Sequence, residues 1–174
     1  MKEKLVLFLD RDGVINEKRL DYVKNINELK FLPNIFNSIK KFKDIGFMII
    51  IITNQSVVNR KIISEIQLKE IHDYMLKIME KNSCKIAKIY YCPHHPDEKC
   101  KCRKPNTGMI EQAIKEFEIK IPNAILIGDS ESDIEAATRM KMKSIKIQTD
   151  GQLLDLIDSV KDIFFKQLNK KCEI

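Results

Sequence analysis

The sequence predicts an α/β protein built on a Rossmann-like, doubly wound parallel sheet. Five short apolar runs recur along the chain, and segments with helical periodicity separate them. Runs that are apolar throughout suit strands buried on both faces, and strands that alternate with helices favour a parallel sheet covered on both sides. At 174 residues and 44% hydrophobic content, the chain can form one well-packed domain but is short for two. We therefore expect a single domain over residues 1–174.

Each expected element follows from its local pattern. The expected strands are the apolar runs at residues 4–9, 47–52, 86–91, 124–127 and 144–147. The expected helices lie at residues 33–45, 64–81, 107–118, 133–140 and 153–168. The first helix has a proline near its start, and the second opens with Ser-Glu-Ile-Gln, which is typical of a capping box. The long irregular stretch at residues 14–32 predicts only a minimal cap, or flap, over the sheet edge.

Composition and charge exclude several classes of protein. No apolar run approaches the roughly 18 residues that a membrane-spanning helix needs, and the N-terminus lacks the apolar core of a signal peptide. We expect a cytoplasmic protein without a membrane partner. The net charge is +6, from 31 basic and 25 acidic residues, but the lysines are scattered rather than clustered. We therefore expect no nucleic-acid partner, and a modest positive field would suit a small phosphorylated substrate. We also expect a monomer.

Chemically active residues follow the predicted strands, at the edge where ligands bind in such sheets. Asp10 and Asp12 follow the first strand, Thr53-Asn54-Gln55 follows the second, and Asp129 follows the fourth. Three carboxylates at one edge repel one another unless a cation lies between them, and oxygen ligands with room for water suit Mg²⁺. The sequence therefore predicts a magnesium site at this edge, although an Asp-Arg-Asp-Gly segment is also typical of a simple turn.

The loop at residues 92–105 follows the third strand and contains three of the five cysteines. Cys92, His94, Cys100 and Cys102 supply three thiolates and one imidazole, the set that a closed, structural Zn²⁺ site requires. His95 is the weaker candidate for the imidazole ligand. A zinc-containing nucleic-acid-binding module and a redox protein using the Cys100-x-Cys102 pair are the alternatives, whereas Cys84 and Cys172 stand alone and predict no chemistry.

Four ordered motifs resemble those of the haloacid dehalogenase superfamily of phosphatases. They are Asp10-Arg11-Asp12-Gly13, Thr53-Asn54-Gln55-Ser56, Arg103-Lys104-Pro105 and Gly128-Asp129-Ser130-Glu131-Ser132-Asp133. Their order over about 125 residues is far more specific than any one motif alone. The resemblance implies a phosphatase of the same doubly wound fold.

The resemblance also implies a role for each matching residue. Asp10 would be the nucleophile, Asp12 the general acid and base, and Lys104 a fixed positive charge. Magnesium would be held by the Asp10 carboxylate, the Asp12 backbone carbonyl and the Asp129 carboxylate. Asp133 would support the site, either beside the metal or by pairing with the lysine, although an acid at a helix start is equally typical of simple dipole compensation.

The remaining implied contacts concern the substrate. Thr53, Asn54 and Gln55 are expected at the phosphoryl group, and Arg60 or Arg103 at a second phosphate. The zinc loop and the segment Asp21-Tyr22-Val23 are similar to a branch that contains phosphatases of heptose 1,7-bisphosphate, used for lipopolysaccharide and other surface glycans, and of histidinol phosphate. Hydrolysis of a heptose bisphosphate is the preferred interpretation. Histidinol phosphate and 3′-phosphorylated nucleic-acid ends remain as alternative substrates.

Overall fold

Five parallel strands form the sheet, in the order β3-β2-β1-β4-β5. The computed structural model describes residues 4–169, so Cys172 lies outside the described residues. The strands are β1 (Leu5–Leu9), β2 (Phe47–Asn54), β3 (Lys88–Cys92), β4 (Ala124–Gly128) and β5 (Lys143–Lys146). The strand order reverses direction at β1, as in doubly wound folds, and the crevice at that reversal is the expected ligand site.

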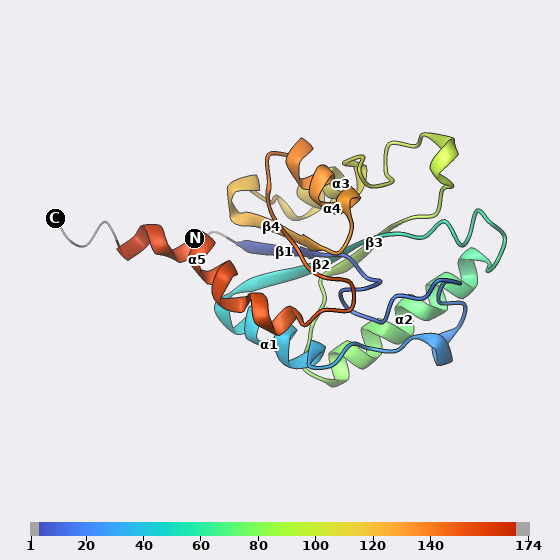
Figure 1. Cartoon of the computed structure of the whole chain (residues 1–174), viewed down its shortest axis with the longest axis horizontal. Helices are drawn as coiled ribbons and strands as arrows, with labels where there is room; N and C mark the ends of the chain where they lie inside the picture. Colours follow the sequence, from blue (N-terminus) through green and yellow to red (C-terminus); the bar gives the residue numbers. More distant parts are fainter. Residues whose placement is uncertain (1–3, 170–174) are drawn as a thin grey trace.

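Helices cover both faces of this sheet (Figure 1). They are α1 (Ile35–Ile45), α2 (Glu65–Lys81), α3 (Gly108–Phe117), α4 (Glu131–Arg139) and α5 (Ile157–Asn169), with short 3-10 turns at Ile26–Glu28, Pro96–Glu98, Ile121–Asn123 and Leu153–Leu156. α1, α2 and α5 pack on one face, and α3 and α4 pack on the other. The predicted fold class is therefore confirmed. Among the described residues, no helix has both the length and the apolar character needed to cross a membrane.

The alternation of side chains along β1 explains why the apolar run is continuous. Val6 and Phe8 lie in the core beneath α3 and α4, whereas Leu7 and Leu9 lie in the core beneath α1, α2 and α5. All four side chains are fully buried. Because each such side chain contributes roughly 1.5–3 kcal/mol when removed from water, the two cores hold the central strand firmly in register.

The start of α2 agrees with the sequence pattern, whereas the starts of α4 and α5 differ from it. The capping box of α2 is present: Ser64 Oγ accepts from the Gln67 backbone N–H (3.2 Å), and Gln67 Oε1 accepts from the Ser64 backbone N–H (2.8 Å). α4 begins at Glu131, two residues before the expected start, and the last helix is preceded by the 3-10 turn at Leu153–Leu156. These shifts concern helix ends, where local hydrogen bonding rather than periodicity decides the boundary.

The irregular stretch at residues 14–32 is anchored at its base and open at its tip. Val14 and Ile15 are fully buried, and the Leu32 backbone N–H donates to the Ile15 carbonyl (3.0 Å). The Glu17 N–H donates to the Lys30 carbonyl (2.8 Å), whereas Leu20 at the tip is fully exposed. This short excursion, rather than a separate domain, forms the wall beside the carboxyl edge of the sheet.

The turn after β1 requires glycine at position 13. Gly13 has a φ of +84°, and a Cβ there would lie 2.5 Å from Asp129 Oδ2. Gly46, at the end of α1, has a φ of +109° but open space around it. Both positions favour glycine for backbone reasons, but only Gly13 also faces a steric limit.

We expect Gly13→Ala to lower the free energy of unfolding by about 3 kcal/mol, because a left-handed backbone and an atomic overlap act together. Gly46→Ala is the matched control, for which the backbone effect alone predicts about 1–2 kcal/mol. Urea denaturation of both variants measures the difference. Equal losses would show that the approach of Asp129 to residue 13 imposes no limit.

Candidate active site

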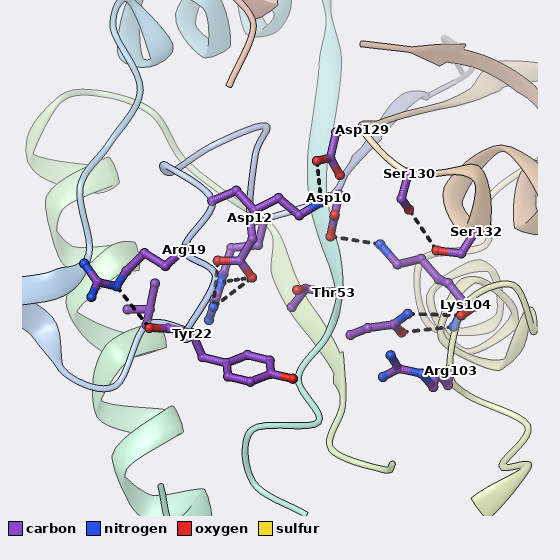
Figure 2. A pocket seen from close by; sticks show the side chains of 14 residues that line it. Asp10, Asp12, Arg19, Tyr22, Thr53, Arg103, Lys104, Asp129, Ser130 and Ser132 are labelled. Atoms are coloured by element: carbon purple, nitrogen blue, oxygen red, sulfur yellow. Dashed lines mark hydrogen bonds and ion pairs between the residues drawn. The ribbon is translucent and has the colours of Figure 1, made fainter. Parts of the chain in front are cut away.

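A cavity of about 220 Å³ opens at the carboxyl edge of the sheet, at the reversal point beside β1. Figure 2 shows side chains from the ends of β1, β2 and β4, from the stretch 14–32 and from the loop after β3 converging on it. Its lining residues are Asp10, Arg11, Asp12, Lys18, Arg19, Tyr22, Val23, Thr53, Asn54, Arg103, Lys104, Asp129, Ser130 and Ser132. The position agrees with the expectation drawn from the strand ends.

At the base of the cavity, the Lys104 ammonium joins two carboxylates. Its Nζ lies 2.9 Å from Asp10 Oδ1 and 2.5 Å from Asp133 Oδ1, and it donates to the Ile52 carbonyl (2.7 Å). Burial raises the pKa of Asp10 to about 6, against the opposing effect of Lys104. Burial alone would lower the pKa of Lys104, but the two carboxylates outweigh it and raise that pKa. The lysine therefore stays charged.

Three carboxylates meet beside this lysine. One oxygen each from Asp10, Asp129 and Asp133 lies within 4.8 Å of the others. Asp129 Oδ2 accepts from Lys18 Nζ (2.6 Å) and Thr149 Oγ1 (2.8 Å), whereas Asp129 Oδ1 is buried with no hydrogen-bond partner among the described residues. An unpartnered buried carboxylate oxygen is costly unless a cation or water satisfies it. This donor set fits a hard divalent cation such as Mg²⁺.

Asp133 reaches the cluster because residue 128 has no side chain. A Cβ on Gly128 would lie 2.3 Å from Asp133 Cγ. Asp133 Oδ2 accepts from the Ser130 backbone N–H (3.1 Å) and hydroxyl (2.6 Å), while its other oxygen contacts Lys104. The same carboxylate thus closes the first turn of α4 and pairs with the lysine, so both roles considered from the sequence are compatible with its position.

Asp12 is held by a separate set of donors. Its carboxylate accepts from the Arg11 guanidinium (2.9–3.2 Å), from Asn16 Nδ2 (2.9 Å) and from Gln55 Nε2 (2.8 Å). Burial opposes the charged form, but Arg11 and the hydrogen bonds outweigh it and lower the pKa of Asp12. The Asp12 side chain lines the cavity but lies apart from the three clustered carboxylates.

The end of β2 positions the loop that contains Lys104. Asn54 Oδ1 accepts from the Lys104 backbone N–H, and Asn54 Nδ2 donates to the Lys104 carbonyl, both at 3.0 Å. Thr53 is almost fully buried, and its hydroxyl oxygen accepts from Gln55 Nε2 (2.8 Å). Asn54 therefore fixes the position of the loop at Lys104 and also lines the cavity.

The cysteine loop brings its four predicted ligands together. The three sulfur atoms of Cys92, Cys100 and Cys102 lie 3.2–3.5 Å apart, and His94 Nδ1 lies 3.2 Å from Cys102 Sγ and 3.5 Å from Cys92 Sγ. His95 instead accepts from the Asp97 backbone N–H, outside this cluster. Three thiols and one imidazole at these separations fit a tetrahedral Zn²⁺ ion, whose bonds to sulfur and nitrogen are about 2.0–2.3 Å.

Two residues expected at the substrate are not among those that line the cavity. Gln55 is buried, and its Nε2 donates to Asp12 Oδ2 and Thr53 Oγ1, so it orients two residues that line the cavity. Arg60 is exposed and is not among the residues that line the cavity. Arg103 does line it, and Figure 2 shows its guanidinium opposite the Tyr22 hydroxyl.

The structure adds residues that the motifs did not indicate. Lys18, Arg19 and Tyr22 come from the stretch 14–32 and line the cavity. Lys18 is placed by its own backbone N–H, which donates to Asp150 Oδ1 (2.8 Å). The sequence signals for this wall were its length, its position after Asp12 and the resemblance of the segment Asp21-Tyr22-Val23.

Comparison with known proteins identifies the family. A family model described as polynucleotide kinase 3 phosphatase matches residues 5–154. A Photorhabdus laumondii protein named D-glycero-alpha-D-manno-heptose-1,7-bisphosphate 7-phosphatase is 42% identical over 141 residues, covering 77% of this chain and 76% of that protein. The chain belongs to the heptose-bisphosphate phosphatase family. Its fold is that of a solved had-like phosphatase from Mesorhizobium loti, which superposes with a TM-score of 0.78 at 22% identity over 92% of this chain and 88% of that one. The resemblance seen in the four motifs is thereby confirmed, and the chain is a phosphatase.

Other members of the heptose-bisphosphate phosphatase family span nearly the whole chain. A Campylobacter jejuni protein with the same alpha name is 38% identical and covers 96% of this chain and 98% of its own length. A Haemophilus influenzae protein, named for the beta anomer, is 33% identical and covers 94% and 98%. The solved structure of D,D-heptose 1.7-bisphosphate phosphatase from B. bronchiseptica, complexed with magnesium and phosphate, superposes with a TM-score of 0.79 at 24% identity, covering 90% of this chain and 97% of that one. That structure supports the fold assignment.

We expect Lys104→Met to lower the free energy of unfolding by about 3–5 kcal/mol, because two buried carboxylates lose their partner. The matched control is Lys146→Met, which removes an exposed lysine paired with Glu131 and should leave the midpoint of urea denaturation close to that of the wild type. Comparable losses in both variants would contradict a special role for the buried pair. The measurement is made without added divalent cation, so that lysine alone offsets the carboxylates.

Proposed function

We propose that the chain is a Mg²⁺-dependent hydrolase that removes the 7-phosphate of D-glycero-D-manno-heptose 1,7-bisphosphate through an aspartyl-phosphate. The observation that carries the proposal is the cavity in which Asp10 pairs with the Lys104 ammonium and clusters with the carboxylates of Asp129 and Asp133. The names of curated relatives at 33–42% identity support the substrate. On this proposal the protein acts in the cytoplasm as a monomer, supplies heptose for surface glycans and has no nucleic-acid partner.

Asp10 and Asp12 divide the chemistry into two displacements. An Asp10 oxygen attacks phosphorus, the bond from phosphorus to the sugar oxygen breaks, and Asp12 delivers a proton to that oxygen. Asp12 then removes a proton from a water molecule whose oxygen attacks the aspartyl-phosphate, releasing phosphate and restoring Asp10. The lowered pKa of Asp12 suits the second step, while the negative charge of an arriving phosphate favours its protonated form in the first.

The rest of the cavity offsets charge and orients the phosphoryl group. Magnesium held by Asp10 and Asp129 together with the Asp12 backbone carbonyl, and supported by Asp133, would supply positive charge where a carboxylate meets a phosphate dianion. The Lys104 ammonium pairs with the Asp10 carboxylate at 2.9 Å and contributes a second positive charge. Thr53 and Asn54 border the cavity where they can donate to phosphoryl oxygens.

Arg103 is the residue we assign to the second phosphate. It lines the cavity, and its Nη1 donates to the His94 carbonyl (3.4 Å), which joins it to the cysteine loop. A planar guanidinium suits bidentate binding of a phosphate. Zinc bound by Cys92, His94, Cys100 and Cys102 would be structural, fixing the loop that presents Arg103 and Lys104.

A 3′-phosphatase acting on nucleic-acid ends is the second candidate, favoured by the description of the matching family model. The two substrates share a phosphomonoester and differ in what surrounds it. The cavity of about 220 Å³ between Tyr22 and Arg103 suits a small sugar bisphosphate better than a polymer. The chemistry at Asp10 would be the same in either case.

Phosphate release from a matched panel tests this function. With Mg²⁺ present, we expect turnover of one or both anomers of heptose 1,7-bisphosphate to exceed that of histidinol phosphate and of a 3′-phosphorylated oligonucleotide. The matched control Asp10→Asn should reduce turnover by about 10³-fold or more, because an amide cannot serve as the nucleophile. Preference for the oligonucleotide would replace the sugar with the second candidate, and full activity of Asp10→Asn would exclude the aspartyl-phosphate.

The cysteine cluster predicts a coupled loss of zinc and of substrate affinity. In Cys100→Ser, a poorer ligand replaces a thiolate, so we expect bound zinc to fall from one equivalent toward none and KM to rise by about 10-fold. Elemental analysis and steady-state kinetics measure the two effects. Cys84→Ser is the control, since Cys84 is buried away from the cluster and its thiol donates to the Phe36 carbonyl. An unchanged KM in a zinc-free variant would separate the loop from substrate binding.

A further inference from the structure

Behind Asp12, Arg11 is almost fully buried and has partners on two sides. Its Nε and Nη2 donate to the Asp12 carboxylate at 2.9–3.2 Å, and its Nη1 lies 3.1 Å from His72 Nε2. Only 1% of Arg11 is exposed. A guanidinium is rigid and planar. A hydrogen bond to one of its nitrogen atoms therefore also fixes the direction in which the other nitrogen atoms donate.

His72 holds the edge of Arg11 that lies away from Asp12. It comes from α2, is 5% exposed, and packs at a tilt against the Tyr91 ring with centroids 5.4 Å apart. Because arginine can only donate, His72 Nε2 must accept, which places the ring proton on Nδ1. Burial and the charge of Arg11 lower the pKa of His72 to about 3, against Asp12 and Asp73, so the ring is neutral.

We propose that His72 is a positioning residue for the reaction: its imidazole fixes the plane of Arg11, and Arg11 in turn aims the Asp12 carboxylate at the oxygen of the leaving group. The proposal rests on the function proposed above, because it assigns a task to residues behind the acid and base. Asn16 and Gln55 each donate one hydrogen bond to Asp12, whereas Arg11 donates from both Nε and Nη2 and also carries a charge.

A positioning role for His72 predicts unequal effects on substrates with good and poor leaving groups, whereas a purely structural role predicts equal effects. A sugar alcohol is a poor leaving group that needs the proton of Asp12, whereas p-nitrophenolate leaves readily without one. Asp12 also serves the later hydrolysis of the aspartyl-phosphate, which is the same for both substrates. The comparison therefore uses kcat/KM, which reports only the steps up to departure of the leaving group, and misdirection of Asp12 lowers it much more for the first substrate than for the second. A general loss of folded enzyme slows both substrates equally.

The experiment compares His72→Leu with His72→Gln, using heptose 1,7-bisphosphate and p-nitrophenyl phosphate. We expect His72→Leu to lower kcat/KM for the sugar substrate by about 10–100-fold, with KM nearly unchanged, and to lower kcat/KM for the aryl substrate by less than about 3-fold. His72→Gln should recover much of the sugar turnover, since its amide oxygen can accept from Arg11. Met79→Ala, a buried change two turns further along α2, is the control that lowers stability without altering the ratio between substrates.

Equal losses on both substrates, or no loss on either, would overturn the proposal. A second measurement does not depend on variants that fold or on the identity of the sugar. Nitrogen NMR of the wild-type protein should show His72 with its proton on Nδ1 and an acceptor Nε2, and a proton on Nε2 would equally overturn it. A wild type that hydrolyses p-nitrophenyl phosphate but not the sugar would refute the proposed substrate instead, and the comparison would then use the alkyl phosphate of the panel that is turned over.

Discussion

The buried ammonium of Lys104 is the interaction on which the site depends. It contacts groups from three segments of the chain: the Asp10 carboxylate after β1, the Ile52 carbonyl in β2, and the Asp133 carboxylate in the first turn of α4. Without the lysine, the two carboxylates would repel each other. Each of these contacts is almost entirely shielded from water, so each is stronger than it would be at the surface. The lysine also fixes the loop that contains it, because Asn54 bonds both backbone groups of the same residue.

Two layers of polar side chains surround this lysine and have different tasks. The inner layer, Asp10, Asp129 and Asp133, concentrates negative charge and leaves one oxygen of Asp129 unsatisfied. The outer layer, Arg11 with His72, fixes one carboxylate that stands apart from that charge. On the proposed function, this separation keeps the Asp12 carboxylate from being drawn into the proposed cation site.

The sequence was sufficient for the fold and for residues that immediately follow strands. Asp10 and Asp129 could be predicted because strand ends are marked by a change from apolar to polar residues, and parallel strands bring those ends together. Lys18 could not, since it belongs to a stretch without periodicity whose path is set by a hydrogen bond to Asp150, 132 residues away. His72 lies on the apolar stripe of α2, where a histidine looks like an ordinary core residue until the direction of Arg11 is known.

The cysteine cluster and the carboxylate cluster also differ in chemical hardness. β2 and β3 are paired so that Asn54, beside the carboxylates, lies opposite Cys92, so the two clusters occupy neighbouring ends of one sheet. Thiolates favour soft ions such as zinc, and carboxylate oxygens favour hard ions such as magnesium. On the proposed function, these two ligand sets would sort their ions by chemical character, because a zinc ion held by sulfur would not compete for the oxygen ligands.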